Sequence, residues 1–389
     1  MASKRSSIAN EDRRLKEKRG ETVDIPFLVL VMMLLAVGLT MLYSASFAQS
    51  EYDTHYESST RYLVKQAICA AIGLVAMFFF SRIPAEVWYH SAWLLYGISI
   101  VLLLSVLLVG QEVNGAKRWI NIGGIQFQPS EVAKFTMILL FARLTRKFGP
   151  DAEKFRFGVL GFGMALMGIL VPLALEKHLS AIMLMGMVAV VMMYVAGTSV
   201  KWLLAGAGAA AVFVLVYISF MGYAGDRVTA WLHPEQDPGD TGYQILQSLY
   251  AIGSGGLFGL GLGKSKQKYL YLPFQYNDYI FAIICEEIGL VGAVLIMVLF
   301  SAAICRGYWI ALRARDRFST VLAAGLVTLI AVQTILNLAV VTNLLPSTGI
   351  SLPFFSYGGT ALAVNLGEMG IVLGISRGRC EIKKQEVIL

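Results

Sequence analysis

Long apolar runs alternate with short polar connections along almost the whole chain after residue 24. A helix that crosses a bilayer needs about 20 mostly apolar residues, within a range of about 17–25. Runs of this kind predict ten spans, near residues 25–47, 63–81, 88–109, 130–145, 157–175, 179–196, 202–221, 279–304, 319–342 and 357–376. The pattern therefore predicts an all-α integral membrane protein with both termini on the same side. It divides the chain into a polar segment at 1–24, a membrane domain at 25–376 and a tail at 377–389.

The connection between the seventh and eighth predicted spans, residues 222–278, is unusually long, which is uncommon unless the loop is functional. Within it, the segment Gly242–Gly263 is apolar enough to resemble a further span. It carries seven glycines, however, and each glycine weakens a helix by about 1 kcal/mol relative to Ala. We therefore expect a short amphipathic helix over Tyr243–Ile252 and then a glycine-rich turn, both at the outer membrane interface.

Composition and charge define the environment and the orientation. The chain of 389 residues is 57% hydrophobic and only 15% charged, so most of it must lie in lipid. If the termini are cytoplasmic, the predicted inner segments hold 22 of the 32 Lys and Arg residues, as the positive-inside rule requires. The net charge of +7 then reflects topology and gives no reason to expect a nucleic-acid partner. The cysteines and histidines show neither disulfide nor zinc-site spacing.

A lone aspartate, Asp278, stands where the long outer loop enters the eighth predicted span. A carboxylate at this boundary can meet a lipid-borne substrate and still exchange protons with water. Ionisable groups in membrane segments are costly enough that a functional role is the first hypothesis. Asp is also a favoured helix N-cap. The two roles are compatible, and the sequence leaves both open.

The loop that enters the fourth predicted span supplies four more charged candidates. Glu131 and Lys134 are three residues apart, so they share one helical face and can pair. The pair either faces the bundle interior and lines a cavity leading to Asp278, or lies at the surface with Lys134 extended towards water. Lys117 and Arg118 are either cavity residues or ordinary headgroup anchors.

The long outer loop adds an amide and a cluster of cations, Gln244, Lys264, Lys266 and Lys268. Three lysines within five residues on the outer side run against the positive-inside trend. They are candidates for holding an anionic group such as a diphosphate through charge-assisted hydrogen bonds. The alternative is a solvated charged loop.

The segment Leu345–Gly359 is strongly apolar, yet its two prolines and three glycines preclude a continuous helix. Irregular backbone at membrane depth is tolerated only against protein or a water-filled cavity, so we expect it to fold back over the outer cavity. The hydroxyl of Ser356 is a candidate substrate ligand. Gln333 and Asn337 share a helical face and predict hydrogen bonds between helices. Glu368 has no assigned role.

Three motifs taken together resemble the SEDS family of bacterial cell-wall polymerases, which contains FtsW, RodA and SpoVE. They are GAKRWINIGGIQFQPSEVAK, GLGKSKQKYLYLP followed by NDYIFAIICEEIGLVG, and LLPSTGISLPFFSYGGTAL. The resemblance covers residues 25–378 and is closer to the FtsW and SpoVE branch. The chain departs from the family pattern at Phe274, where an acidic residue is usual, and at Leu175–Ser180, where the family often has Gln-Pro-Asp-Leu-Gly-Thr.

The resemblance implies a peptidoglycan glycosyltransferase that polymerises lipid II during cell division, at the outer face of the bacterial cytoplasmic membrane. It places the family's catalytic aspartate on Asp278 and the family's polar pair on Glu131 and Lys134. Its implied partners are undecaprenyl-diphosphate-linked glycan, a class B penicillin-binding protein acting as transpeptidase, and other division proteins. The leaving diphosphate would be met by the outer-loop cations or by a divalent cation, Mg²⁺ or Mn²⁺, shared with Asp278. A lipid II flippase and a non-catalytic scaffold that activates a transpeptidase are the alternative functions.

Overall fold

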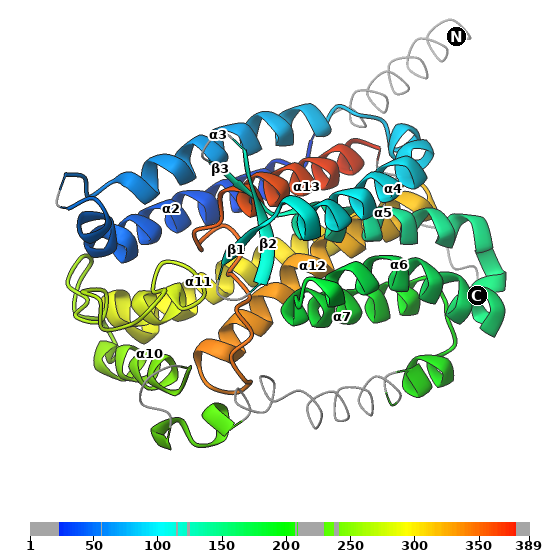
Figure 1. The fold of residues 1–389 in the computed structure, drawn as a ribbon. Helices are drawn as coiled ribbons and strands as arrows, with labels where there is room; N and C mark the ends of the chain where they lie inside the picture. The colour runs from blue at the N-terminus through cyan, green and yellow to red at the C-terminus, as the bar shows by residue number, and fades with distance from the viewer. Residues whose placement is uncertain are drawn as a thin grey trace, which may run out of the picture.

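The computed structural model describes residues 23–55, 57–113, 116–122, 125–206, 208, 229–236 and 241–378. Most of this chain forms a bundle of long helices (Figure 1). In chain order the α-helices are α2 (Ile25–Asp53), α3 (Arg61–Phe80), α4 (Ala85–Val109), α5 (Pro129–Phe148), α6 (Phe162–Leu175), α7 (Leu179–Val195), α10 (Thr241–Gly255), α11 (Ile280–Leu312), α12 (Arg317–Val341) and α13 (Gly359–Arg377). Short helical turns are η1 (Gly149–Glu153), η2 (Phe155–Gly161) and η3 (Pro234–Gln236).

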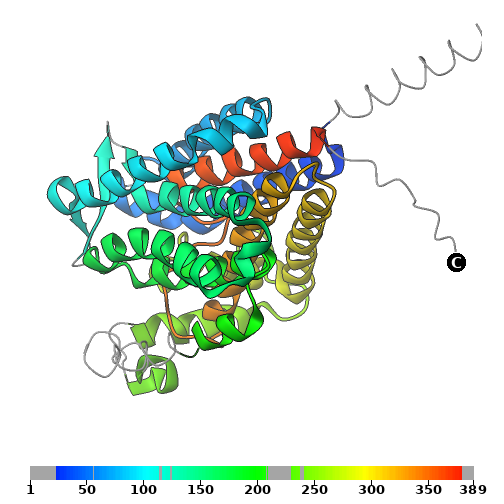
Figure 2. The same cartoon turned by 90° about the vertical axis from the view of Figure 1, so that its right-hand side faces the viewer.

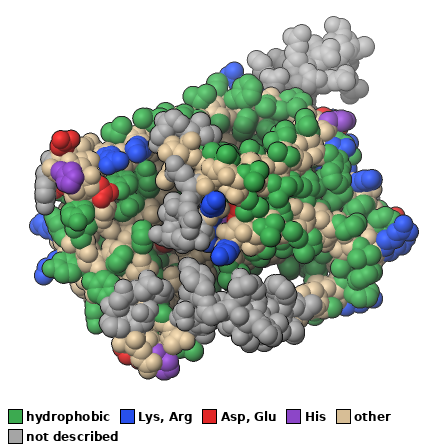
Figure 3. Space-filling model, viewed as in Figure 1, with side chains coloured by type: hydrophobic (Ala, Val, Ile, Leu, Met, Phe, Trp, Pro, Cys, Tyr) green, Lys and Arg blue, Asp and Glu red, His purple; other side chains and the backbone are tan. Residues whose placement is uncertain are grey.

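Seven helices of the described chain are long and apolar enough to cross a membrane: α2, α3, α4, the continuous Phe155–Leu175 helix, α11, α12 and α13. Hydrophobic side chains cover much of the face seen in Figure 3, and its charged side chains gather mainly towards its two ends, although some Lys or Arg side chains lie near its centre. The chain is therefore a multi-pass membrane protein. The predicted fourth span is the more polar α5, which carries five charged residues, and the sixth is α7, with 17 residues. The predicted span at 202–221 lies mostly outside the described residues.

One segment corrects the all-α prediction. Residues 111–127 form a three-stranded antiparallel sheet, in the order β1 (Gln111–Val113), β2 (Ala116–Ile122) and β3 (Ile125–Phe127). Aromatic and β-branched residues dominate the second half of β2, and two glycines at positions 123–124 separate β2 from β3. That arrangement is a hairpin signal. The hydropathy pattern hid it because the strands are too short to form a separate apolar run.

The helix ends near the two termini lie together (Figure 2). Asp24 caps α2 by accepting a hydrogen bond from the backbone N–H of Phe27 at 2.9 Å. Its carboxylate also pairs with Arg306 of α11 at 2.9 Å, and its own N–H donates to Ser376 Oγ of α13 at 3.0 Å. The membrane domain therefore begins and ends at one end of the bundle, as the ten-span prediction requires.

A break in α11 receives the glycine-rich turn that follows α10. At Gly289 the backbone adopts φ 67°, and the N–H of Leu290 donates to Gly256 O at 2.9 Å. A Cβ placed on Gly259 would lie 2.2 Å from Glu287 O, so only glycine allows the two backbones to approach this closely. The structure thus confirms the predicted helix followed by a turn, and it shows that the turn packs against α11.

Residues 342–358, which the structure describes in full, contain no helix, as predicted. Two amides of α12 hold this segment: Gln333 Nε2 donates to Ser351 O at 3.0 Å and Asn337 Nδ2 donates to Ile350 O at 2.7 Å. The prediction of hydrogen bonds between helices is therefore corrected. These amides satisfy carbonyl groups of an irregular segment, which would otherwise be buried without partners.

Candidate active site

Asp278 lies in the turn before α11. Arg306, which pairs with Asp24 where the ends of the membrane domain meet, lies 26 residues beyond the first residue of this helix, so Asp278 is at the end of the bundle away from the termini. The N-cap position of α11 is Tyr279, which makes no side-chain capping bond, and Asp278 is the residue before it. Asp278 is partly exposed, and a Cβ placed on Gly349 would lie 3.3 Å from its Oδ2. Its carboxylate therefore faces the irregular segment 342–358.

The backbone around Asp278 is fixed by side chains from distant elements. Asn337 Nδ2 donates to Asp278 O at 2.7 Å. Ser356 Oγ donates to Asn277 O at 2.6 Å and accepts from the N–H of Leu352 at 2.7 Å. The hydroxyl of Ser356, predicted to bind substrate, is thus engaged in positioning the residue before Asp278.

The Glu131–Lys134 pair is buried. The Lys134 Nζ–Glu131 Oε2 distance is 2.7 Å, and the two side chains are only 5% and 9% exposed. The pair therefore faces the bundle interior, and the surface alternative is wrong. That it lines a cavity leading to Asp278 stays a prediction. Two more buried ionisable groups lie within electrostatic reach of Lys134, namely Glu368 of α13 and His178 before α7. Glu368, which the sequence left without a role, thus belongs to a polar cluster inside the bundle.

The turn between α6 and α7 completes this cluster. Arg118 of β2, which is partly exposed, donates from Nη2 to Lys177 O and so contacts this turn. Burial raises the pKa of Glu176 to about 8, although the charge of Arg118 opposes this. Burial also lowers the pKa of His178 to about 3, and the positive charges of Arg118 and Lys134 act in the same direction. At neutral pH both Glu176 and His178 are therefore mainly uncharged.

The polar cluster and Asp278 border the same irregular segment. Ser180 Oγ, at the start of α7, donates to Thr348 O. The next residue, Gly349, is the one that faces Asp278. A movement of segment 342–358 would therefore change contacts both beside the polar cluster, at Ser180, and at the candidate catalytic carboxylate.

The three lysines of the predicted outer-loop cluster lie in two different environments, one buried and two exposed. Lys268 is 2% exposed, and its Nζ lies 3.0 Å from Glu287 Oε1 and 3.3 Å from Ser44 Oγ. Its ammonium is committed to this buried contact, which corrects its assignment to diphosphate binding. Lys264 and Lys266 are exposed and stay candidates.

Two other predicted residues have accessible side chains. Gln244 is partly exposed on α10, and Lys117 is exposed on β2 beside Arg118. Their proposed contact with substrate stays a prediction.

Sequence reasoning missed the roles of Glu286 and Glu287, which interrupt the apolar run of α11. Glu286 accepts hydrogen bonds from Ser265 Oγ and from the backbone N–H of Lys266 at 2.9 Å, while Glu287 pairs with Lys268. Two adjacent carboxylates in an apolar helix were the available signal, since buried charges require partners. They fasten the outer loop to the helix that follows Asp278.

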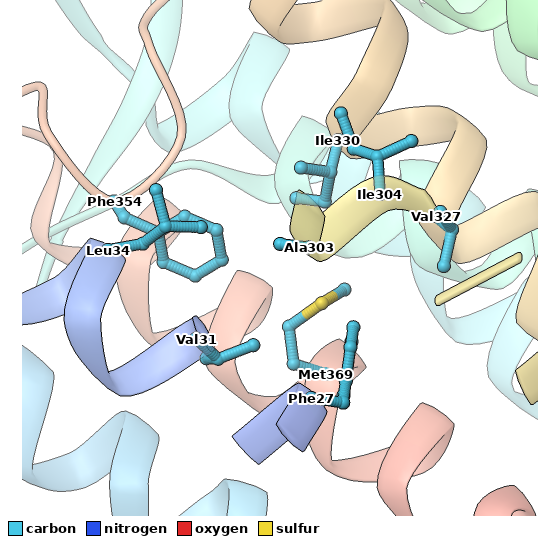
Figure 4. Close-up of a pocket in the computed structure, with 9 residues that line it drawn as sticks. All are labelled: Phe27, Val31, Leu34, Ala303, Ile304, Val327, Ile330, Phe354 and Met369. Atoms are coloured by element: carbon cyan, nitrogen blue, oxygen red, sulfur yellow. The ribbon is translucent and has the colours of Figure 1, made fainter. Parts of the chain in front are cut away.

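A separate pocket between α2, α11, α12 and α13 is lined only by apolar side chains, including Phe27, Leu34, Ile330 and Met369 (Figure 4). It offers no polar group for recognition and belongs to the packing of the bundle. Among the described residues, no three His, Cys, Asp or Glu side chains converge in a metal site. A divalent cation shared between Asp278 and a diphosphate stays a prediction.

Comparison with known proteins identifies the family. A family model described as "Cell cycle protein", covering FtsW, RodA and SpoVE, matches residues 25–381. The chain is 38% identical to Stage V sporulation protein E of Bacillus subtilis, over 91% of this chain and 97% of that protein. It is 37% identical to "Probable peptidoglycan glycosyltransferase FtsW" of Trichlorobacter lovleyi, over 91% and 93% of the respective chains.

Two solved structures share the fold. The Rod shape determining protein RodA of Thermus thermophilus matches with a TM-score of 0.68 and 26% identity, over 92% of this chain and 98% of that one. A chain from "Structural coordination of polymerization and crosslinking by a peptidoglycan synthase complex" matches with a TM-score of 0.77 and 27% identity, over 91% and 98%. The chain belongs to the FtsW/RodA/SpoVE family of membrane proteins.

Proposed function

We propose that this protein is a peptidoglycan glycosyltransferase that polymerises lipid II into glycan strands, with Asp278 as the general base. The observation that carries the proposal is the position of Asp278: a partly exposed carboxylate whose backbone is fixed by Asn337 and Ser356, at the end of the bundle away from the termini. The relatives named as peptidoglycan glycosyltransferases support the same reaction class.

The reaction requires one base and a stabilised leaving group. Asp278 accepts the proton of the 4-hydroxyl of one sugar while that oxygen bonds to the anomeric carbon of another. The bond from the anomeric carbon to the lipid diphosphate breaks, and the diphosphate leaves with the electron pair. Lys264 and Lys266 would meet its negative charge. Asp278 would be the residue to hold a divalent cation, Mg²⁺ or Mn²⁺, which when bound would supply further positive charge to the leaving group.

Positioning explains why so many polar groups surround a single carboxylate. Holding a hydroxyl, a carboxylate and an anomeric carbon in the reactive arrangement lowers the activation free energy considerably, provided that the geometry is kept closely. Asn337 and Ser356 hold the backbone of Asn277 and Asp278, and Gln66 of α3 donates to Ser356 O at 3.1 Å. Two helices, α3 and α12, and segment 342–358 thus fix the base.

The cellular setting follows from the family. Relatives named FtsW and Stage V sporulation protein E support a role in septal wall synthesis, with the active site on the outer face of the cytoplasmic membrane. The peptidoglycan synthase complex among the similar structures supports a class B penicillin-binding protein as partner. Undecaprenyl-diphosphate-linked glycan is then the product that remains in the membrane. Other division proteins recruit this protein and its penicillin-binding partner.

The test is direct. Purified protein, alone and with its transpeptidase, is given labelled lipid II, and the products are separated by length on a gel. We expect a ladder of glycan strands. A lipid II flippase would instead move labelled lipid II across proteoliposomes without forming strands. A scaffold would give strands only through the activity of its partner, and either result would refute the proposal.

A further inference from the structure

The inner end of α11, where the membrane domain begins and ends, carries a tryptophan held by two arginines. The guanidinium carbons of Arg306 and Arg313 each lie 3.9 Å from the ring centroid of Trp309. Trp309 is three residues after Arg306 and four before Arg313, so helical spacing puts all three on one face of α11. Cation–π contacts restrain guanidinium groups that would otherwise rotate freely in water. The side chain of Arg313 is therefore held in a defined position.

The arginines at this end differ in their acidic partners. Arg306 donates from Nε and Nη2 to the carboxylate of Asp24, at 3.0 and 2.9 Å. Neither Arg313 nor Arg315, which follows in the turn before α12, forms an ion pair within the described chain. The acid of that turn, Asp316, uses its carboxylate to cap α12. The turn thus presents two exposed guanidinium groups whose charge no carboxylate of the described residues neutralises.

This end of α11 lies at the surface of the bundle and at the edge of the bilayer. Asp24, the partner of Arg306, directly precedes the apolar run of α2, so this ion pair marks the end of the hydrocarbon layer. Trp309 is about one turn further along α11 and therefore at the depth of the lipid headgroups, where tryptophan is enriched. Leu312 is 77% exposed, and α11 lies along the edge of the bundle in Figure 2. A lipid can therefore contact this end of the helix.

We propose that Arg313 and Arg315 bind the phosphate of an anionic phospholipid in the adjoining leaflet, with Leu312 against an acyl chain. Guanidinium groups suit phosphate because they can donate two parallel hydrogen bonds to it. A zwitterionic headgroup also carries an ammonium group, which the two arginines would repel, so a headgroup with a net negative charge is favoured. The positive-inside rule explains why cations lie at this end, but not why one of them is held against a tryptophan without a carboxylate partner. Binding at this site is independent of strand synthesis.

The experiment measures lipid binding to the full-length protein in a neutral detergent by native mass spectrometry. Phosphatidylglycerol is the anionic probe and phosphatidylcholine the zwitterionic one, and the wild type should bind phosphatidylglycerol more tightly. Arg313→Gln combined with Arg315→Gln should weaken phosphatidylglycerol binding about 30-fold, because each cation near a membrane surface contributes about a factor of five. Arg82→Gln combined with Arg156→Gln is the matched control, because it removes the same charge from exposed arginines elsewhere, after α3 and in η2. The control should bind phosphatidylglycerol like the wild type.

Several outcomes would overturn the lipid site. One is equal phosphatidylglycerol affinity in the wild type and the variant that lacks Arg313 and Arg315; another is equal affinity of the wild type for the two lipids. An equal loss in the control variant would show only a general attraction to the positive surface. If the variant keeps its phosphatidylglycerol affinity but no longer associates with the transpeptidase, the surface is a protein interface instead. The replaced arginines are exposed, so the unfolding midpoint in neutral detergent should not change, and the comparison of the two lipids on the wild type requires no variant to fold.

Discussion

The part of the chain that the structure describes contains two buried Lys–Glu ion pairs, which differ in their surroundings. In the loop–helix pair, Lys268 and Glu287 are 3.0 Å apart, and Ser44 Oγ lies 2.7 Å from both carboxylate oxygens of Glu287. In the single-helix pair, Glu131 and Lys134 of α5 are 2.7 Å apart.

Each pair has a buried carboxylate nearby. Glu286, beside the first pair, accepts hydrogen bonds from Ser265 and Lys266, whereas neither carboxylate oxygen of Glu368 has a hydrogen-bond partner among the described residues. The second pair therefore has a different kind of neighbour. Its surroundings include Glu368 and His178, both buried and both ionisable. A pair whose polar atoms are satisfied by fixed neutral groups acts as a structural fastener, whereas ionisable neighbours are typical of functional sites. The comparison predicts that Lys268 matters mainly for stability and Lys134 mainly for activity.

The largest effect on stability is expected for Lys268→Met. The substitution leaves Glu287 charged and buried without its cation, which typically costs about 3–5 kcal/mol. Thermal unfolding of the purified protein should show a clearly lowered midpoint. Lys266→Met is the control, because Lys266 is exposed, and it should unfold like the wild type. An unchanged midpoint for Lys268→Met would show that this pair is not a fastener.

Lys134→Met should have a smaller effect on stability and a larger effect on strand synthesis. The pair lies within α5, three residues apart, so its loss separates no two elements of the fold, and the remaining cost is that of an unsatisfied buried polar group, about 1–3 kcal/mol. Unfolding and strand synthesis are measured on the same preparation. When Lys134→Met and Glu131→Gln are combined, their effects on the free energy of unfolding and on the rate of strand synthesis should be less than additive. Full activity in both single variants would remove the distinction between the two pairs.

The polar cluster should also make stability depend on pH. The folded-state pKa of Glu176, about 8, lies above its ordinary value, so this group stabilises the protein at low pH and the contribution is lost as pH rises towards 8. His178 acts in the opposite sense, but its contribution changes only below about pH 6.5. Between about pH 6.5 and 8, the unfolding midpoint should therefore fall, and Glu176→Gln should flatten this slope. The same slope in the variant would exclude Glu176 as its origin.

The smallest effect is expected for the exposed cations. Replacing both Lys264 and Lys266 with Ala should raise the KM for lipid II only a few-fold, since exposed charges contribute about 0.2–1 kcal/mol each. The increase should shrink at high salt. Lys65→Ala, at an exposed position of α3, is the control and should leave the KM unchanged. If the KM does not change when Lys264 and Lys266 are replaced, other groups bind the diphosphate.

The helices could be predicted because their apolar runs are long: the span predicted at 63–81 is α3, Arg61–Phe80. The candidate base could also be found, because an isolated carboxylate at a membrane boundary is a local signal. The sheet at residues 111–127 was missed because its short strands leave little trace in hydropathy.

The partners of charged residues could not be predicted. Lys268 looks like a free cation in the sequence, because the turn that brings it onto Glu287, 19 residues further on, leaves no periodic pattern. Likewise, nothing local shows that Asn337 holds the carbonyl of Asp278. Such roles depend on which helices pack together, and no pattern within one helix encodes that.

The central claim, that Asp278 is the base, is tested most directly by Asp278→Asn. Asn has the size of Asp but cannot accept the proton. The cap of α11 is Tyr279 and Asn337 binds a backbone carbonyl, so neither is altered by the change. With an unchanged unfolding midpoint, the purified variant should make glycan strands from lipid II about 10²- to 10⁴-fold more slowly. Strand synthesis near the wild-type rate would contradict the account.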